Sequence, residues 1–323
     1  MSTNPYPSSS SQSEPAKPRT RLAGLNTDPA FQAISAPELR HRILISHAAE
    51  RVRQLSQRYI GLPVGRVALG TWLRNGPGAA RVERFGLPYH VVLEAVKPRA
   101  LMLEVDPRQL IQMSELPPRG SSERPSALSF IWDGDWDLHR NDLRGAFWLE
   151  YMRDLDENRG HLERTLEFKK HMAAIEAGKP TREHRSGMFL NTPERIIQYL
   201  KVYLAFLDEM GSHGYQADRP SSGIGVLVSR DGRLLKTRKG MHRTAMAQWV
   251  GLPRIPVEVR HVHRDWWNKV TAGCTGREAL DRMVHALKDC TPETRPGPMD
   301  ALPPFVMPDH FWPAPKHAAH RPD

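Results

Sequence analysis

The chain has 323 residues, of which 39% are hydrophobic, enough to bury a sizeable core. No apolar run approaches the roughly 18 to 20 residues of a membrane-spanning helix, and the N-terminal stretch MSTNPYPSSSSQSEPAKPRTR lacks the apolar core of a secretory signal. Two cysteines, Cys274 and Cys290, cannot form a disulfide framework and are expected to be reduced thiols of a cytoplasmic protein. The net charge of +10 favours a partner with phosphates: a nucleotide, a nucleic acid or an anionic membrane surface.

The N-terminal part predicts a tail, a helix and two strands. Residues 1–22 are rich in Ser, Pro and basic residues, which is typical of a disordered tail, and residues 23–100 are expected to form an N-terminal helix and strand extension. The helix of this extension should begin near Ser35. Arginines lie between its apolar positions and would form a basic outer face, which is typical of a solvated surface or of one that rests on anionic lipid. The runs YHVVLEAV and ALMLEVDP predict a pair of strands.

The middle of the chain predicts an aspartate-rich segment followed by helices. In LSFIWDGDWDLH, an apolar run leads into three aspartates. Residues 144–178 are expected to be mainly helical. A clearer helix should follow Thr192, a good N-cap residue that precedes a proline, and Gly211 should end it.

The stretch GVLVSRDGRLLKTRKGMHRTAMAQWVGLPRIPVEV predicts a hairpin, a helix and a strand. GVLVS and RLLKT flank Arg230-Asp231-Gly232, and Asp-Gly suits a tight hairpin turn. HRTAMAQWV is rich in helix formers and closes at Gly251, and IPVEVRHV reads as a strand. Residues 268–323 predict a C-terminal helix and a proline-rich tail that packs aromatic side chains onto the body.

The glycine of KGMHR is a candidate phosphate site. If a strand ends near Thr237 and a helix begins near Met241, Gly240 lies where unpaired N–H groups and the helix dipole favour an anion. Arg243 would add a charged fork and His242 a second donor. The basic residues that raise the local potential are Lys236, Arg238 and Lys239. The candidate binding residues are therefore Lys239, Gly240, Met241, His242, Arg243 and Thr244, and the alternative is an ordinary basic turn.

The run IWDGDWD is the acidic candidate. Asp133, Asp135 and Asp137 alternate, so on an extended segment they would share a face. Clustered carboxylates can hold Mg²⁺ with the phosphates of a nucleotide, and one can accept a hydroxyl proton during phosphoryl transfer. Asp133 and Asp135 are thus candidate metal ligands, and Asp135 and Asp137 candidate catalytic residues. A polar turn anchored by two tryptophans is the alternative.

Two histidines, His261 and His263, alternate on the last predicted strand, and Asp265 follows them. A metal site here would need a third ligand placed by the fold. We expect structural histidines at the end of a strand instead.

Together these motifs resemble the ParB/sulfiredoxin-like fold, whose shared core has a Gly-x-(His/Arg)-Arg motif at a helix N-terminus. The chain is more similar still to ParB-like proteins that combine a GDWD element, a DGRHRLAIA…LGL…IPV element and a following RH…W. Here these elements lie at 134–137, at 240–247 with 251–257, and at Arg260-His261 with Trp266. LEVDPRQLIQM, at 103–113, resembles the segment that opens this core.

The resemblance implies an α+β fold with a small mixed sheet. Its core would span 101–267, with a helical insertion at about 144–213 and irregular termini. Members of the wider fold bind ATP, ADP or CTP with this motif, and some, such as free serine kinases, transfer phosphate to a hydroxyl. Met241 stands where sulfiredoxins have a cysteine, so sulfinic-acid repair is not expected. No helix-turn-helix pattern follows the core, unlike in chromosome-partition ParB proteins.

These observations lead to one expected function and two alternatives. We expect a phosphotransferase that uses Mg²⁺ and ATP, or another nucleoside phosphate, and acts on the hydroxyl of a small molecule or sugar. The first alternative is a ParB-like nucleotide switch or DNA-associated protein without phosphotransfer. The second is a ParB-like nuclease that uses the acidic cluster with metal.

Overall fold

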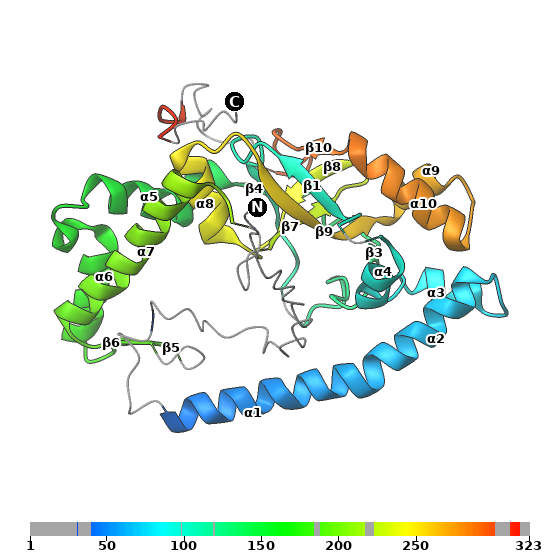
Figure 1. Ribbon diagram of the computed structural model, residues 1–323, viewed down its shortest axis with the longest axis horizontal. Helices are drawn as coiled ribbons and strands as arrows, with labels where there is room; N and C mark the ends of the chain where they lie inside the picture. Colours follow the sequence, from blue (N-terminus) through cyan, green and yellow to red (C-terminus); the bar gives the residue numbers. More distant parts are fainter. Residues whose placement is uncertain are drawn as a thin grey trace, which may run out of the picture.

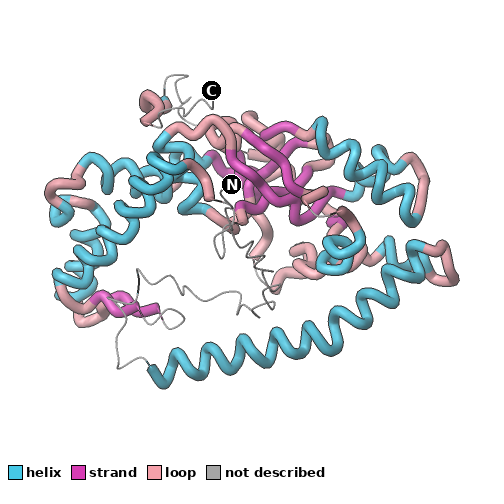
Figure 2. The backbone as a smooth tube through the Cα atoms, in the orientation of Figure 1, coloured by secondary structure: helices cyan, strands magenta, loops and turns pink. Residues whose placement is uncertain are grey.

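The computed structural model describes residues 31, 40–97, 99–118, 120–183, 188–216, 223–300 and 311–316. Over these residues the fold is α+β, as expected. Figure 1 shows a central sheet with one group of helices on the left, a second on the right, and a long helix below. Figure 2 shows that the longer strands gather between the two helical groups.

The helices, in chain order, are α1 (Arg40–Ser56), α2 (Leu62–Leu73), α3 (Ala79–Arg84), α4 (Tyr89–Ala95), α5 (Phe147–Glu157), α6 (Leu166–Glu176), α7 (Pro193–His213), α8 (Met241–Val250), α9 (Arg264–Thr271) and α10 (Gly276–Ala286). The strands are β1 (Met102–Val105), β2 (Gln112–Ser114), β3 (Ile131–Trp132), β4 (Arg140–Asp142), β5 (Thr181–Glu183), β6 (Met188–Leu190), β7 (Ile224–Val228), β8 (Arg233–Lys236), β9 (Ile255–His263) and β10 (Thr291–Pro292). A π-turn, η3 (Gln57–Gly61), joins α1 to α2.

The main sheet is mixed and has the order β1-β9-β7-β8-β2-β4. The predicted hairpin of β7 and β8 lies at its centre, and β9 runs parallel to β7 after the crossover through α8. Strand β1 pairs antiparallel with β9, while the short strands β3 and β10 add to β9 and β8. All five residues of β7 are buried, because elements cover both faces of this central strand.

The predicted helices between residues 144 and 213 are confirmed. Helix α7 begins as expected: the Thr192 hydroxyl accepts a hydrogen bond from the N–H of Arg195, at 3.4 Å. The predicted end at Gly211 is wrong, because α7 continues to His213 and stops at Gly214 (φ 70°). A glycine within a helix costs only about 1 kcal/mol, whereas the left-handed φ at residue 214 suits glycine and ends the helix.

The predicted strand YHVVLEAV is wrong. Residues Tyr89–Ala95 form helix α4, and the following segment, β1, pairs with β9 instead of with them. The two adjacent valines favour a strand by propensity alone. Tertiary packing decides otherwise, because the helix buries Tyr89, Val91 and Val92 together in the core.

The predicted N-terminal helix and C-terminal tail are partly described. Helix α1 is described from Arg40, so the expected start near Ser35 and the expected disordered tail at 1–22 lie outside the described residues. Near the C-terminus, Phe311 and Trp312 pack against the core as predicted. Cys274 and Cys290 form no disulfide. Among the described helices, none has the length and apolarity to cross a membrane.

Candidate functional site

The candidate phosphate turn connects β8 to α8 at Gly240. This glycine has φ 82°, in the left-handed region that favours glycine. A Cβ here would lie 3.0 Å from Cγ1 of Ile224 and 3.1 Å from the carbonyl oxygen of Gly223. Glycine is therefore required by the close packing of the turn against the start of β7, whether or not a ligand binds.

Helix α8 begins without a side-chain cap. Among the hydrogen bonds of the described residues, none uses the N–H groups of Gly240, Met241 or His242. These N–H groups point along the start of the helix, where its dipole is positive. The turn thus has the backbone donors that an anion needs.

Lys236 lies beneath this turn. Its side chain is fully buried, and Nζ donates to the carbonyl oxygens of Thr237 and Lys239, each at 2.5 Å. Burial, together with the nearby charge of Lys239, lowers the pKa of Lys236 to about 7. Lys236, expected from the sequence to raise the local positive potential, is therefore only partly charged near pH 7 and ties the turn together from inside.

Lys239 joins the turn to a polar cluster on β9. Its Nζ lies 2.7 Å from Oε2 of Glu258, and Nη1 of Arg260 lies 3.3 Å from the same oxygen. The Tyr89 hydroxyl donates to Oε1 of Glu258 at 3.1 Å. Burial alone would raise the pKa of Glu258, but the bonds with Lys239 and Arg260 outweigh it and hold the pKa below its usual value. The carboxylate is therefore ionised at neutral pH beside the turn.

Glu258, Arg260 and Tyr89 are absent from the candidates named from the sequence. The alternation along β9 carries a signal for two of them, because the partly exposed Glu258 and Arg260 alternate with the buried residues Val257, Val259 and His261. Nothing local indicates that Lys239 meets them. That contact depends on β9 lying beside β7, which only the strand order decides.

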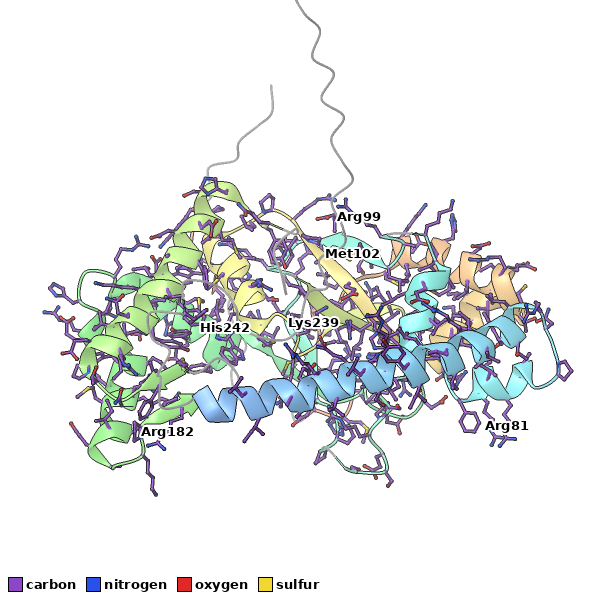
Figure 3. All side chains as sticks on the ribbon, turned by 60° about the horizontal axis from the view of Figure 1, so that its bottom comes forward. Arg81, Arg99, Met102, Arg182, Lys239 and His242 are labelled. Atoms are coloured by element: carbon purple, nitrogen blue, oxygen red, sulfur yellow. The ribbon has the colours of Figure 1, made fainter. Side chains whose placement is uncertain are left out.

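Three of the predicted binding residues, Met241, His242 and Thr244, have side chains that pack into the protein. His242 packs between the rings of Trp148 of α5 and Tyr203 of α7, at centroid distances of 4.3 and 4.9 Å. Burial and the charge of Arg243 lower the pKa of His242 to about 4, so it is neutral at pH 7. Figure 3 labels Lys239 and His242, which lie on either side of the first residue of α8.

Met241 and Thr244 are buried. The Thr244 hydroxyl donates to the carbonyl oxygen of Gly240 at 3.0 Å and so stabilises the first turn of α8. Neither side chain is therefore available to a ligand, which corrects their place among the binding candidates. Arg243 is partly buried and lies near Tyr215, where its charge opposes the rise in pKa that burial causes. Lys239 and Arg243 remain as side-chain candidates, and Gly240, Met241 and His242 remain as backbone donors.

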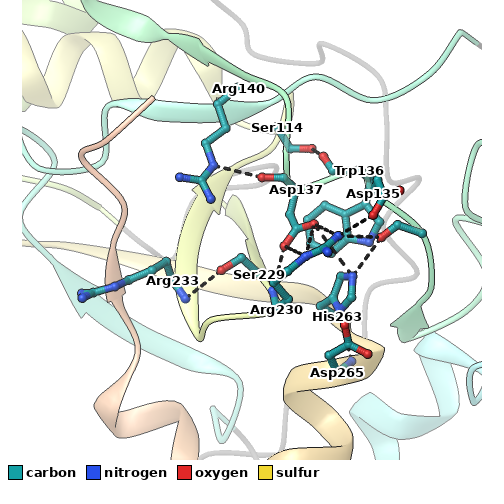
Figure 4. A network of polar contacts seen from close by, with 11 residues as sticks. Ser114, Asp135, Trp136, Asp137, Arg140, Ser229, Arg230, Arg233, His263 and Asp265 are labelled. Atoms are coloured by element: carbon teal, nitrogen blue, oxygen red, sulfur yellow. Dashed lines mark hydrogen bonds and ion pairs between the residues drawn. The ribbon is translucent and has the colours of Figure 1, made fainter. Parts of the chain in front are cut away.

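The GDWD segment forms a separate polar network, shown in Figure 4. The carboxylate of Asp137 is fully buried and accepts hydrogen bonds from the N–H of Arg230 at 2.8 Å and from its guanidinium at 2.8 to 3.1 Å. Asp135, whose side chain is 72% exposed, contacts the same guanidinium at 2.8 Å. Asp133 pairs with Arg264 at 2.9 Å. Each aspartate thus has an arginine partner, and Asp137 fastens its loop to the β7–β8 turn.

This network and the Gly240 turn lie at opposite ends of β8. Arg230 precedes the strand and Gly240 follows it, and the four residues of β8 alone span roughly 13 Å. The structure therefore does not bring Asp135 and Asp137 to the predicted phosphate turn. Over the described part of the chain, no three His, Cys, Asp or Glu side chains gather in a group that would hold a metal ion.

The two histidines of β9 have structural contacts, as expected. The ring of His261 stacks on Trp132 at 3.8 Å, and its Nδ1 bonds to the carbonyl oxygen of Ser129 at 2.7 Å. His263 caps α9, because its Nδ1 accepts from the N–H of Asp265 at 3.0 Å. Its Nε2 bonds to the carbonyl oxygen of Gly134 at 2.9 Å, so it also supports the GDWD loop.

Comparisons with known protein families, with curated proteins and with solved structures found no match for this chain. The ParB/sulfiredoxin-like resemblance therefore depends on the sequence motifs alone. What the chain does must be inferred from its own residues and contacts.

Proposed function

We propose that this protein binds a nucleoside phosphate, such as ATP, at the N-terminus of α8. The observation that carries the proposal is the set of N–H groups of Gly240, Met241 and His242, which no hydrogen bond among the described residues uses and which lie beside Lys239 and Arg243. Backbone donors, a positive helix end and two basic side chains together suit a phosphate. The net charge of +10 agrees with an anionic ligand.

The buried contacts around the turn support a rigid site. Lys236 fixes the carbonyl groups on the inner side, and Ile224 of β7 and the preceding Gly223 pack against Gly240. A turn held in this way does not have to reorganise when an anion binds, so less binding free energy is lost to ordering. Lys239, whose side chain is 42% exposed, can exchange its contact with Glu258 for a phosphate oxygen.

For the reaction, we propose Mg²⁺-dependent transfer of phosphate to a hydroxyl of a small molecule or sugar. Glu258 is the carboxylate that adjoins the turn, through Lys239, and it is ionised. We therefore assign to Glu258, instead of Asp135 or Asp137, the role of binding Mg²⁺ or accepting the hydroxyl proton.

Binding without transfer, as in a nucleotide switch or DNA-associated protein, is the second candidate. One observation favours it: Glu258 already pairs with both Lys239 and Arg260, so its charge is largely compensated before any metal binds. A carboxylate held by two cations is a weaker metal ligand and a weaker base.

The binding proposal is tested with radiolabelled ATP, ADP and CTP in the presence of Mg²⁺. We expect Arg243→Ala to weaken binding on the order of tenfold, because it removes charge-assisted hydrogen bonds to phosphate. Arg254→Ala is the matched control, since Arg254 is exposed beyond the opposite end of α8 and should bind as the unaltered protein does. Normal binding by Arg243→Ala would place the nucleotide elsewhere.

The transfer proposal is tested with labelled ATP and a metabolite extract. With the unaltered protein and with Asp135→Asn, we expect transfer of labelled phosphate to a hydroxyl-bearing compound of the extract. With Glu258→Gln, we expect no transfer. Circular dichroism and nucleotide binding show whether Glu258→Gln is folded. Nucleotide binding by the unaltered protein with neither hydrolysis nor transfer would reject the kinase proposal and leave the switch.

A further inference from the structure

The long N-terminal helix exposes a stripe of large apolar side chains. Figure 1 shows α1 and α2 as one continuous helical rod along the lower edge of the molecule. Eight of the large apolar residues described on this rod are each 50 to 71% exposed, among them Leu44 and Ile45 near the start of α1. The other six lie around η3, and we call these six the apolar stripe: Val52, Leu55, Tyr59, Ile60, Val64 and Val67. Isolated exposed apolar residues are ordinary, whereas a contiguous row marks a surface that contacts something.

The π-turn η3 keeps the stripe on one side of the rod. At about 100° per residue, Val52, Leu55 and Tyr59 fall within an arc of about 60°. In an uninterrupted α-helix, Val64 and Val67 would lie outside that arc by roughly 60° to 120°. The π-turn adds one residue to a turn and sets the following residues back by about 100°, which returns both valines to the same side.

The opposite side of α2 is anchored in the protein. Gly65, Leu69 and Trp72 are buried there, and Nε1 of Trp72 donates to Glu83 at 2.6 Å. A Cβ on Gly65 would lie 2.8 Å from a methyl group of Val91, which shows how closely α2 packs on α4. The rod therefore cannot rotate to bury its apolar stripe without breaking these contacts. The stripe is presented outward by the fold itself.

The charges around the apolar stripe favour an anionic partner. Residues 40–73 contain six arginines and a single acidic residue, Glu50. Glu50 pairs with Arg53 at 2.6 Å. On the helix, exposed Arg51 and Arg58 flank one edge of the stripe and Arg53 the other. A second copy of the chain would bring the same positive charges against these, which opposes self-association through this face.

We propose that the apolar stripe docks on an anionic membrane surface. The rod would lie parallel to the bilayer, with its apolar side chains at the boundary between headgroups and acyl chains and its arginines at the lipid phosphates. Figure 3 shows that α1 and α2 lie in front of the rest of the molecule in that view. Each side chain of the stripe is at least half exposed, so the described elements leave the stripe accessible. The proposal does not depend on nucleotide binding.

Flotation of the full chain with lipid vesicles tests this proposal. We expect the protein to float with vesicles of phosphatidylcholine plus phosphatidylglycerol but not with phosphatidylcholine alone, and added salt should release it. The double variant Leu55→Asp/Tyr59→Asp should reduce the bound fraction on the order of tenfold. Leu128→Asp is the control, because Leu128 lies outside the stripe and is 67% exposed, against 50% for Leu55 and 68% for Tyr59. This variant should bind like the unaltered protein.

Four outcomes would overturn the proposal. They are no binding to anionic vesicles, equal binding to neutral ones, unchanged binding by Leu55→Asp/Tyr59→Asp, and loss of binding by Leu128→Asp as well. Sedimentation of the same proteins identifies the competing occupant. If the unaltered protein does not bind vesicles but forms an oligomer that Leu55→Asp/Tyr59→Asp dissociates, the apolar stripe is an interface between copies of the chain.

Discussion

Replacing Asp137 tests whether the GDWD segment has a structural or a catalytic role. Its buried carboxylate bonds the main chain and guanidinium of Arg230. Breaking a fully buried ion pair costs about 3 to 5 kcal/mol, but the side chain of Arg230 is 26% exposed, so part of this is recovered by hydration. We therefore expect Asp137→Ala to lower the free energy of unfolding by about 2 to 4 kcal/mol.

The neighbouring aspartate is a matched comparison. Asp135 contacts the same guanidinium but is 72% exposed, and exposed ion pairs contribute about 0.5 kcal/mol or less. Asp135→Ala should therefore unfold almost as the unaltered protein does. Both free energies follow from the midpoint and slope of urea unfolding.

A structural role for Asp137 would be contradicted by an Asp137→Ala variant whose free energy of unfolding lies within about 0.5 kcal/mol of the unaltered protein. An Asp135→Ala variant as destabilised as Asp137→Ala would contradict it too. Phosphate transfer gives a second readout. If Asp137→Ala keeps its stability and nucleotide binding but loses transfer, the carboxylate acts in catalysis, as its spacing in the sequence first suggested.

Three further changes test the turn and the helices. Gly240→Ala should cost about 1 to 2 kcal/mol of unfolding free energy, because alanine disfavours φ 82° and its Cβ would crowd Gly223; an unchanged urea midpoint would contradict this. Lys236 releases its proton at a lower pH in the native state, with a pKa of about 7, than in the unfolded chain, with a pKa near 10.5. The unfolded state thus binds more protons between these values, so stability should rise from pH 7 to pH 10, with a limiting slope of about 1.4 kcal/mol per pH unit from this residue. Lys236→Met should flatten that rise, and equal pH profiles would refute the assignment. Thr192→Ala should cost about 1 kcal/mol in thermal or urea unfolding because it removes the N-cap of α7, and no loss would show that the cap contributes nothing.

Local chemistry in the sequence determined much of the central fold. The Asp231-Gly232 turn predicts the β7–β8 hairpin, and Thr192 with Pro193 predicts the start of α7. The glycines at 240 and 251 bound α8 as predicted. These signals succeed because turn geometry and helix capping depend on residues within a few positions of each other.

Only the tertiary structure decided the partners of the charged groups. From the sequence, Lys236 is expected only to raise the local positive potential, and its burial follows from the place of β8 inside the sheet. Asp137 is a candidate catalytic residue until the hairpin brings Arg230 to it. Glu258 reaches Lys239 only because β9 lies beside β7. Burial and ion pairing join residues that are far apart in the chain, so their energies depend on strand order and packing, which no local pattern in the sequence encodes.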